Sequence, residues 1–231
     1  MFYYYMDPTY ILVLIGVVIC MAASSKMNRT FQKYSRVRSH NGMTGREAAE
    51  RILHSQGIYD VRVEHVSGNL TDHYDPRTKR LALSQDVYGR TSVAAVCVAA
   101  HECGHAIQHN INYAPLNIRS AIVPVANIGS SLSWPIFLLG LILSIPALTT
   151  VGIVLFSLAV LFQLVTLPVE FNASSRALKM LESTGILSRE ENKGAKKVLT
   201  AAALTYVAAL ASSILQLLRL LILSGGRRRD D

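Results

Sequence analysis

The chain has 231 residues, of which 51% are hydrophobic and only 16% are charged, against about 25% charged residues in an ordinary soluble domain. This composition disfavours a purely soluble protein and excludes disordered, collagen-like and coiled-coil chains. The 23 Lys and Arg against 15 Asp and Glu give a net charge of +8. In a membrane protein such an excess is read first as topology, so no nucleic-acid partner is expected.

The first apolar segment, YILVLIGVVICMAA, covers residues 10–23. Counted from Met6, it is just long enough to span a bilayer, and the tyrosines at positions 3–5 and 10 are typical of an interfacial belt. A cleaved signal peptide would carry its charges before the apolar run, whereas here they follow it. We therefore expect residues 1–25 to be a membrane anchor.

Basic residues follow this anchor, and more than half of the 23 Lys and Arg lie within residues 26–119. The positive-inside rule places this segment in the cytoplasm and the N-terminus outside. Anionic lipid headgroups could also bind the first basic cluster, although topology alone accounts for it. The cluster comprises Lys26, Arg29, Lys33, Arg36 and Arg38.

Residues 26–118 are predicted to form a small cytoplasmic α/β unit. A capping box of Thr44 and Glu47 starts a helix that runs to His54. Short strands are expected at 61–66, 70–74 and 80–84, separated by turn residues. Thr91 or Ser92 then caps a mostly apolar helix through about Asn110.

The later half of the chain alternates apolar and charged segments. Residues 121–145 and 147–169 are uncharged and predict a membrane hairpin within 119–169, with Pro146 at its turn. Residues 170–197 are basic and therefore expected in the cytoplasm, and Ser188 with Glu191 forms a second capping box within them. Residues 198–223 are apolar except for Arg219 and form a fourth candidate span within 198–231.

The orientation signals conflict at the C-terminus. Four spans would place the arginines at 227–229 outside, against the positive-inside rule. Either the last helix crosses against this rule, or it lies in or on the membrane without crossing. The fold class is accordingly a mostly α integral membrane protein with three or four transmembrane helices.

The strongest chemical signal is His101-Glu102-Cys103-Gly104-His105, which matches H-E-x-x-H on the last predicted helix of the α/β unit. Histidines four residues apart share one helix face, so both imidazoles can reach one Zn²⁺. The intervening Glu102 can take a proton from water beside the metal. Gly104 costs helix propensity, which indicates that close packing is required there.

A catalytic zinc ion usually has a third protein ligand. Gln108 and Ile111 stand where the H-E-x-x-H-x-x-G-x-x-H pattern requires Gly and His, so that class is excluded. Glu170 is the leading candidate, because it follows Pro168 at the end of a span and two spans return it to the side of His105. Further downstream carboxylates are Glu182, Glu190, Glu191, Asp230 and Asp231.

The chain also resembles a known family. The stretches AAHECGHAIQ at 99–108, LTDHYDP at 70–76 and L-x-L-S at 81–84 resemble the YugP-like bacterial membrane zinc metallopeptidases. The resemblance implies a neutral zinc peptidase with a zincin-like catalytic unit in the bacterial cytoplasmic membrane. More distantly the chain is similar to the HtpX and CAAX-protease gluzincins, whose third ligand is the first Glu of an E-x-x-x-D motif.

In this comparison Glu170 matches the motif's Glu and would be the third zinc ligand. Ser174 stands where the motif has Asp, so Ser174 or Asn172 would take over the task of orienting a histidine ligand. The resemblance further implies that an edge strand before the metal helix pairs with the substrate; residues 69–74 are the candidate strand, with Asn69, Leu70 and Thr71 as substrate-binding residues.

Three side chains are candidates for stabilising the oxyanion of the tetrahedral intermediate: His73 or Tyr74, and Tyr206. Each is more simply a turn or packing residue. We expect a zinc endopeptidase with a polypeptide substrate, most simply a membrane protein, and with a regulatory membrane partner or homo-oligomer as further options.

Two alternatives stay open. A zinc-binding scaffold without activity would need a closed four-ligand site, yet Cys103 points away from the histidines. A metal transporter would need polar ligands within its spans, and residues 147–169 offer only Thr, Ser and Gln.

Overall fold

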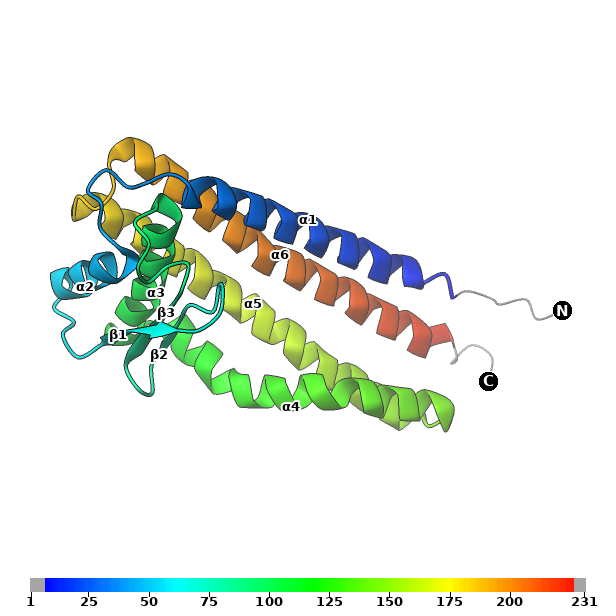
Figure 1. Ribbon diagram of the computed structural model, residues 1–231. Helices are drawn as coiled ribbons and strands as arrows, with labels where there is room; N and C mark the ends of the chain where they lie inside the picture. Colours follow the sequence, from blue (N-terminus) through cyan, green and yellow to red (C-terminus); the bar gives the residue numbers. More distant parts are fainter. Residues whose placement is uncertain (1–6, 227–231) are drawn as a thin grey trace. The chain divides into compact units, whose positions relative to one another are not determined.

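The computed structural model describes residues 7–226, and within them the chain is mostly helical (Figure 1). Four helices are long and apolar enough to cross a membrane: α1 (Tyr10–Ser35), α4 (Ala114–Ile142), α5 (Pro146–Ser183) and α6 (Arg189–Gly226). Between α1 and α4 lie two shorter helices, α2 (Gly45–Ser55) and α3 (Val93–Asn110), and three strands. The expected mostly helical protein with three or four candidate spans and a small sheet is confirmed.

The chain divides into two compact units. The apolar unit comprises, of the described residues, 7–24, 118–167 and 205–226. The polar unit comprises residues 25–117 and 168–204. Helices α1, α4, α5 and α6 each contribute to both units. The tyrosines at 3–5 and the charged residues at 227–231 lie outside the described residues.

In the apolar unit, glycines allow α4 and α5 to pack closely as a hairpin. A Cβ on Gly140 would lie 2.5 Å from the Thr149 nitrogen, and one on Gly152 would lie 2.7 Å from Cβ of Phe137. Small residues at such contacts are typical of packed membrane helices. Many large apolar side chains of this unit are exposed, as expected of surfaces that face lipid.

Arg219, the one charge in the apolar part of α6, is paired within the apolar unit. Its Nη2 lies 3.5 Å from Oδ2 of Asp7, and its Nε donates to the Thr9 hydroxyl at 3.3 Å. The guanidinium also stacks 4.0 Å from the ring centroid of Tyr10. The start of α1 therefore neutralises a cation that would otherwise be costly between apolar helices.

The polar unit is built around α3 and a three-stranded sheet. The strands β1 (Arg62–Val66), β2 (His73–Asp75) and β3 (Arg80–Ser84) lie in the order β1-β3-β2. The central strand β3 pairs parallel with β1 and antiparallel with β2. Its apolar side chains, with those of α2 and α3, form the main core.

Local signals set the helix starts in the polar unit as predicted. Thr44 and Glu47 form a reciprocal capping box on α2, and the Ser92 hydroxyl caps α3 by accepting from the Ala95 nitrogen. Ser188 and Glu191 bond reciprocally at the start of α6.

One predicted boundary is wrong. The second strand was expected at 70–74, but β2 is only His73–Asp75, because Leu70 adopts a positive φ of 55° that breaks an extended chain. Beyond the expected end of the span at residue 169, the helix α5 continues through Pro168 to Ser183. Proline is tolerated in such helices where neighbouring groups satisfy the backbone it frees.

Candidate metal centre

Two helices of the polar unit bring three metal-ligating side chains together. His101 and His105 project from one face of α3, with ring centroids 4.8 Å apart. Glu170 on α5 faces them, with its Oε2 atom 3.3 Å from Nε2 of His101 and 3.7 Å from Nε2 of His105. Within residues 7–226 these three are the only group of three or more His, Cys, Asp or Glu side chains that could hold a metal ion, and their ligand atoms all lie within 4.8 Å of one another.

The approach of α3 to α5 depends on Gly104, which lies between the histidines. A Cβ at this position would stand 2.6 Å from the Ala173 carbonyl oxygen and 3.0 Å from the Ala173 Cα. Because both atoms belong to the α5 backbone, no side-chain rotation could relieve the clash. The expectation that Gly104 makes room for close packing is confirmed.

A buried amide orients His105. Gln108 is fully buried on α3, and its Nε2 donates to the Val169 carbonyl at 2.8 Å and to Oδ1 of Asn172 at 3.0 Å. Arg176 Nε donates to the same Asn172 oxygen at 2.7 Å. Because the Gln108 amide nitrogen already has two acceptors, Gln108 Oε1 must face Nδ1 of His105, 3.1 Å away, and accept a hydrogen bond from it.

This network assigns the proton of neutral His105 to Nδ1 and leaves the Nε2 lone pair directed toward Glu170. Ring orientation by a hydrogen bond to the nitrogen that does not bind metal is usual at histidine metal sites. This role of Gln108 was not predicted from the sequence, where the residue served only to exclude a longer zinc-binding pattern. Its i+3 spacing from His105 on an apolar helix was the available signal, because a buried amide needs partners.

His101 has a comparable contact. The Ser174 hydroxyl of α5 lies 3.3 Å from His101 Nδ1. Ser174 is thus at the position where it could orient His101 in place of the Asp of the E-x-x-x-D motif. Asn172 contacts neither histidine directly and acts on His105 through Gln108.

Comparison with known proteins agrees with this geometry. A family model described as "Putative neutral zinc metallopeptidase" matches residues 9–225. The chain belongs to this family. It is also 50% identical over 201 residues to the "Putative membrane protease YugP" of Bacillus subtilis (strain 168), covering 87% of this chain and 89% of that relative. No solved structure matches the chain. The family expected from residues 70–76, 81–84 and 99–108 is therefore confirmed.

The donor set fits the zinc ion that the family description implies. Ligand atoms about 2.0–2.1 Å from a tetrahedral zinc stand about 3.3 Å apart, close to the 3.3 and 3.7 Å observed between the nitrogens and Glu170 Oε2. Glu170 is only 2% exposed, and a buried carboxylate requires a cation nearby. Two histidines and one glutamate are also a frequent ligand set of catalytic zinc, which keeps one position open.

The residues between the two histidines point in different directions. Glu102 is 8% exposed and does not belong to the ligand group. Burial alone would lower the pKa of His105. The hydrogen bond of His105 with Glu170 and the negative charges of Glu102 and Glu170 have the larger effect, so the pKa of His105 is raised. Cys103 is fully buried on the far side, donates to the Ala49 carbonyl, and burial raises the pKa of its thiol, so it is no candidate ligand.

The segment before the metal helix differs from expectation. Asn69, Leu70 and Thr71 lie in the loop before β2, so of the expected strand over residues 69–74 only His73 and Tyr74 lie in a strand, and pairing with substrate stays a prediction. β2 is one of the two edge strands of the sheet, and β1 is the other. His73 within it is exposed, and its Nδ1 lies 2.8 Å from the Thr71 carbonyl.

Tyr74 ties this edge strand to α3. Its hydroxyl lies 2.9 Å from Nδ1 of His109, near the end of the helix. Burial, with the charges of Asp60 and Asp75, raises the pKa of Tyr74 to about 12, so the hydroxyl stays protonated near neutral pH. His109 therefore anchors β2 beside the metal helix and is not grouped with the metal-ligating side chains.

Other carboxylates considered as the third ligand have different partners. Glu190 pairs with Lys193 at 2.6 Å, and Glu182 accepts from Asn192 at 3.4 Å. Glu191 accepts from the Ser188 nitrogen and contacts His40. Asp230 and Asp231 lie outside the described residues. Tyr206 lies on α6 in the apolar unit and is 39% exposed, and its oxyanion role stays a prediction.

Proposed function

We propose that this protein is a membrane-embedded, zinc-dependent endopeptidase that cleaves membrane or membrane-proximal proteins at the cytoplasmic face. The observation that carries the proposal is the convergence of His101 and His105 of α3 with Glu170 of α5, and Glu102 lies between the two histidines on α3. Membership of a zinc metallopeptidase family and the four apolar helices support it.

In this proposal His101, His105 and Glu170 hold the metal. Bound zinc would supply Lewis acidity, which polarises the scissile carbonyl and acidifies a water molecule. The Glu102 carboxylate takes a proton from the attacking water and later gives it to the leaving amine nitrogen. Gln108 and Ser174 keep the two imidazoles in the orientation that directs their Nε2 atoms toward Glu170.

The substrate would bind as an extended chain. An unpaired edge strand offers main-chain hydrogen bonds that do not depend on substrate sequence, and β2 is such an edge in the described sheet. His73, on this strand, and Tyr206 are the proposed donors to the oxyanion. The orientation rests on the basic residues within 26–119 and 170–197, which the positive-inside rule assigns to the cytoplasm.

The test compares wild-type protein with Glu102→Gln, using Glu50→Gln on α2 as a matched control. Membranes from cells producing each form are searched by mass spectrometry for new protein N-termini. Wild type and Glu50→Gln should generate the same new termini in segments next to spans, and Glu102→Gln should generate none. Equal termini with wild type and Glu102→Gln would refute the catalytic role, and none with any form would favour an inactive zinc-binding scaffold.

A further inference from the structure

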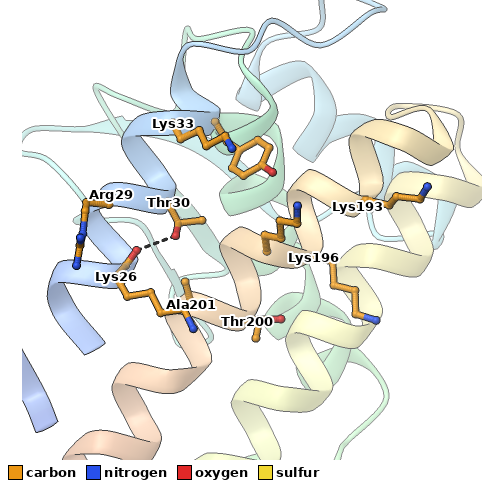
Figure 2. Close-up of a pocket in the computed structure, with 10 residues that line it drawn as sticks. Lys26, Arg29, Thr30, Lys33, Lys193, Lys196, Thr200 and Ala201 are labelled. Carbon is orange, nitrogen blue, oxygen red and sulfur yellow. Dashed lines mark hydrogen bonds between the residues drawn. The ribbon is translucent and has the colours of Figure 1, made fainter. Parts of the chain in front are cut away.

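The polar unit contains a cavity that shares no residue with the metal centre. It has a volume of about 670 Å³ and is lined by α1 and α6 alone, a size within the usual range for small-molecule sites. Figure 2 shows the two helices that carry its lining residues, α1 in blue and α6 in orange. Six of these residues are cationic: Lys26, Arg29, Lys33, Lys193, Lys196 and Lys197.

This positive charge is almost uncompensated. No Asp or Glu lines the cavity. Lys193 pairs with Glu190, whereas within residues 7–226 none of the other five cations forms an ion pair. Like charges converging on one space repel one another, and an anion in that space would relieve the repulsion.

The positive-inside rule does not explain this convergence. That rule concerns the number of basic residues in a cytoplasmic segment and places no demand on where their side chains meet. Here Lys26 and Lys197 come from opposite ends of the chain, yet line one cavity. The convergence therefore indicates a binding site in addition to a topology signal.

The two helices are packed tightly where they form the cavity. A Cβ on Gly194 of α6 would stand 2.6 Å from Cε1 of Tyr34, a lining residue on α1. Only glycine permits the ring to lie this close. Tyr34 and Ala201 add apolar surface beside the ammonium groups, so the cavity combines anion-binding and apolar walls.

The cavity lies where both helices change from polar to apolar. On α1 the apolar run ends at Ala23, just before Lys26, and on α6 the apolar run starts at Val198, just after Lys197. A ligand bound there meets cations at one end and apolar helix surface at the other. A phospholipid has this division, whereas a soluble phosphate compound lacks the apolar part.

We propose that this cavity binds the phosphate headgroup of an anionic phospholipid, with its acyl chains leaving the cavity at the end formed by Lys26 and Ala201. The five unpaired cations exceed the single charge of one phosphodiester, so a headgroup with two phosphates binds more tightly than one with a single phosphate. A lipid bound there contacts both α1 and α6.

The test titrates the full-length protein in uncharged detergent with phosphatidylglycerol that carries a fluorophore on one acyl chain, and follows anisotropy. The cavity variant is Lys33→Gln/Lys196→Gln/Lys197→Gln. The control variant removes the same charge from exposed positions of the polar unit outside the cavity, Arg62→Gln/Arg77→Gln/Lys179→Gln. Circular dichroism verifies that each variant keeps its helices.

At about 1 kcal/mol per basic residue near a membrane surface, the cavity variant should bind roughly 100-fold more weakly. Lys197→Gln alone should bind roughly 5-fold more weakly, and the control variant should match wild type. Phosphatidylcholine and glycerol phosphate should not displace the probe, and a two-phosphate lipid should displace it best. Wild-type binding by the cavity variant, equal loss in the control variant, or equal competition by phosphatidylcholine would overturn the proposal. Displacement by glycerol phosphate would assign the site to a soluble phosphate compound and overturn the lipid assignment.

Discussion

Replacing Gly104 by alanine should weaken zinc binding more than it weakens the fold. The new Cβ would stand 2.6 Å from the Ala173 carbonyl oxygen, so α3 and α5 must separate by about 0.8 Å to reach an ordinary contact of about 3.4 Å. Zinc–ligand distances tolerate only about 0.2 Å. Because α3 carries the histidines and α5 carries Glu170, the separation acts directly on the ligand set.

The two consequences differ in size. Overpacking costs about 1–3 kcal/mol, and alanine regains about 1 kcal/mol of helix propensity, so the metal-free protein should lose about 0–2 kcal/mol of stability. Zinc affinity should fall roughly 10- to 100-fold, as when groups that orient metal ligands are removed.

The assay is competition for zinc against a chromogenic chelator, with thermal unfolding followed by circular dichroism in the presence of EDTA. Gly89→Ala is the matched control, since no atom lies within 4 Å of its added Cβ. It should bind zinc like wild type. A folded Gly104→Ala protein with wild-type zinc affinity would show that the close helix contact does not set the ligand geometry.

Three further changes test other contacts. Gln108→Leu removes the oxygen that accepts a hydrogen bond from His105 and leaves the Val169 carbonyl without its amide donor. Zinc affinity should therefore fall roughly 10- to 100-fold in the chelator competition. Unchanged affinity would contradict the proposed tautomer of His105. Arg219→Leu leaves the Asp7 carboxylate without its cation, and unfolding in a detergent titration should shift by about 1–3 kcal/mol, whereas an unshifted midpoint would deny the pairing a structural role. Cysteines introduced at Tyr59 and Arg90, both exposed, should react with a membrane-impermeant thiol reagent only after cells are opened, and labelling of intact cells would reverse the proposed topology.

Much of the helical framework follows from local signals. The capping pairs at Thr44 and Ser188 and the cap at Ser92 involve residues within three positions of each other, so the sequence alone predicts them. The shared face of His101 and His105 follows from helix periodicity in the same way.

Features that depend on residues far apart in the chain could not be predicted from local sequence signals. The extent of β2 is set by its pairing with β3 and by the conformation of Leu70, neither of which a hydrophobic pattern records. The contacts of Gln108 join residues 61 and 64 positions apart along the chain. Glu170 could be favoured over Glu182, Glu190 and Glu191 from its place after two spans and from family resemblance, but its approach to the histidines required the structure.

The zinc content of two glutamate variants tests the central claim most directly. Glu102 and Glu170 are both carboxylates, but only Glu170 is proposed to bind metal. Elemental analysis of the detergent-purified, folded proteins should find about one zinc per chain in Glu102→Gln, as in a site with its three protein ligands intact. Glu170→Ala, left with His101 and His105, should lose most of its zinc. Full zinc occupancy in a folded Glu170→Ala protein would contradict the proposed ligand triad.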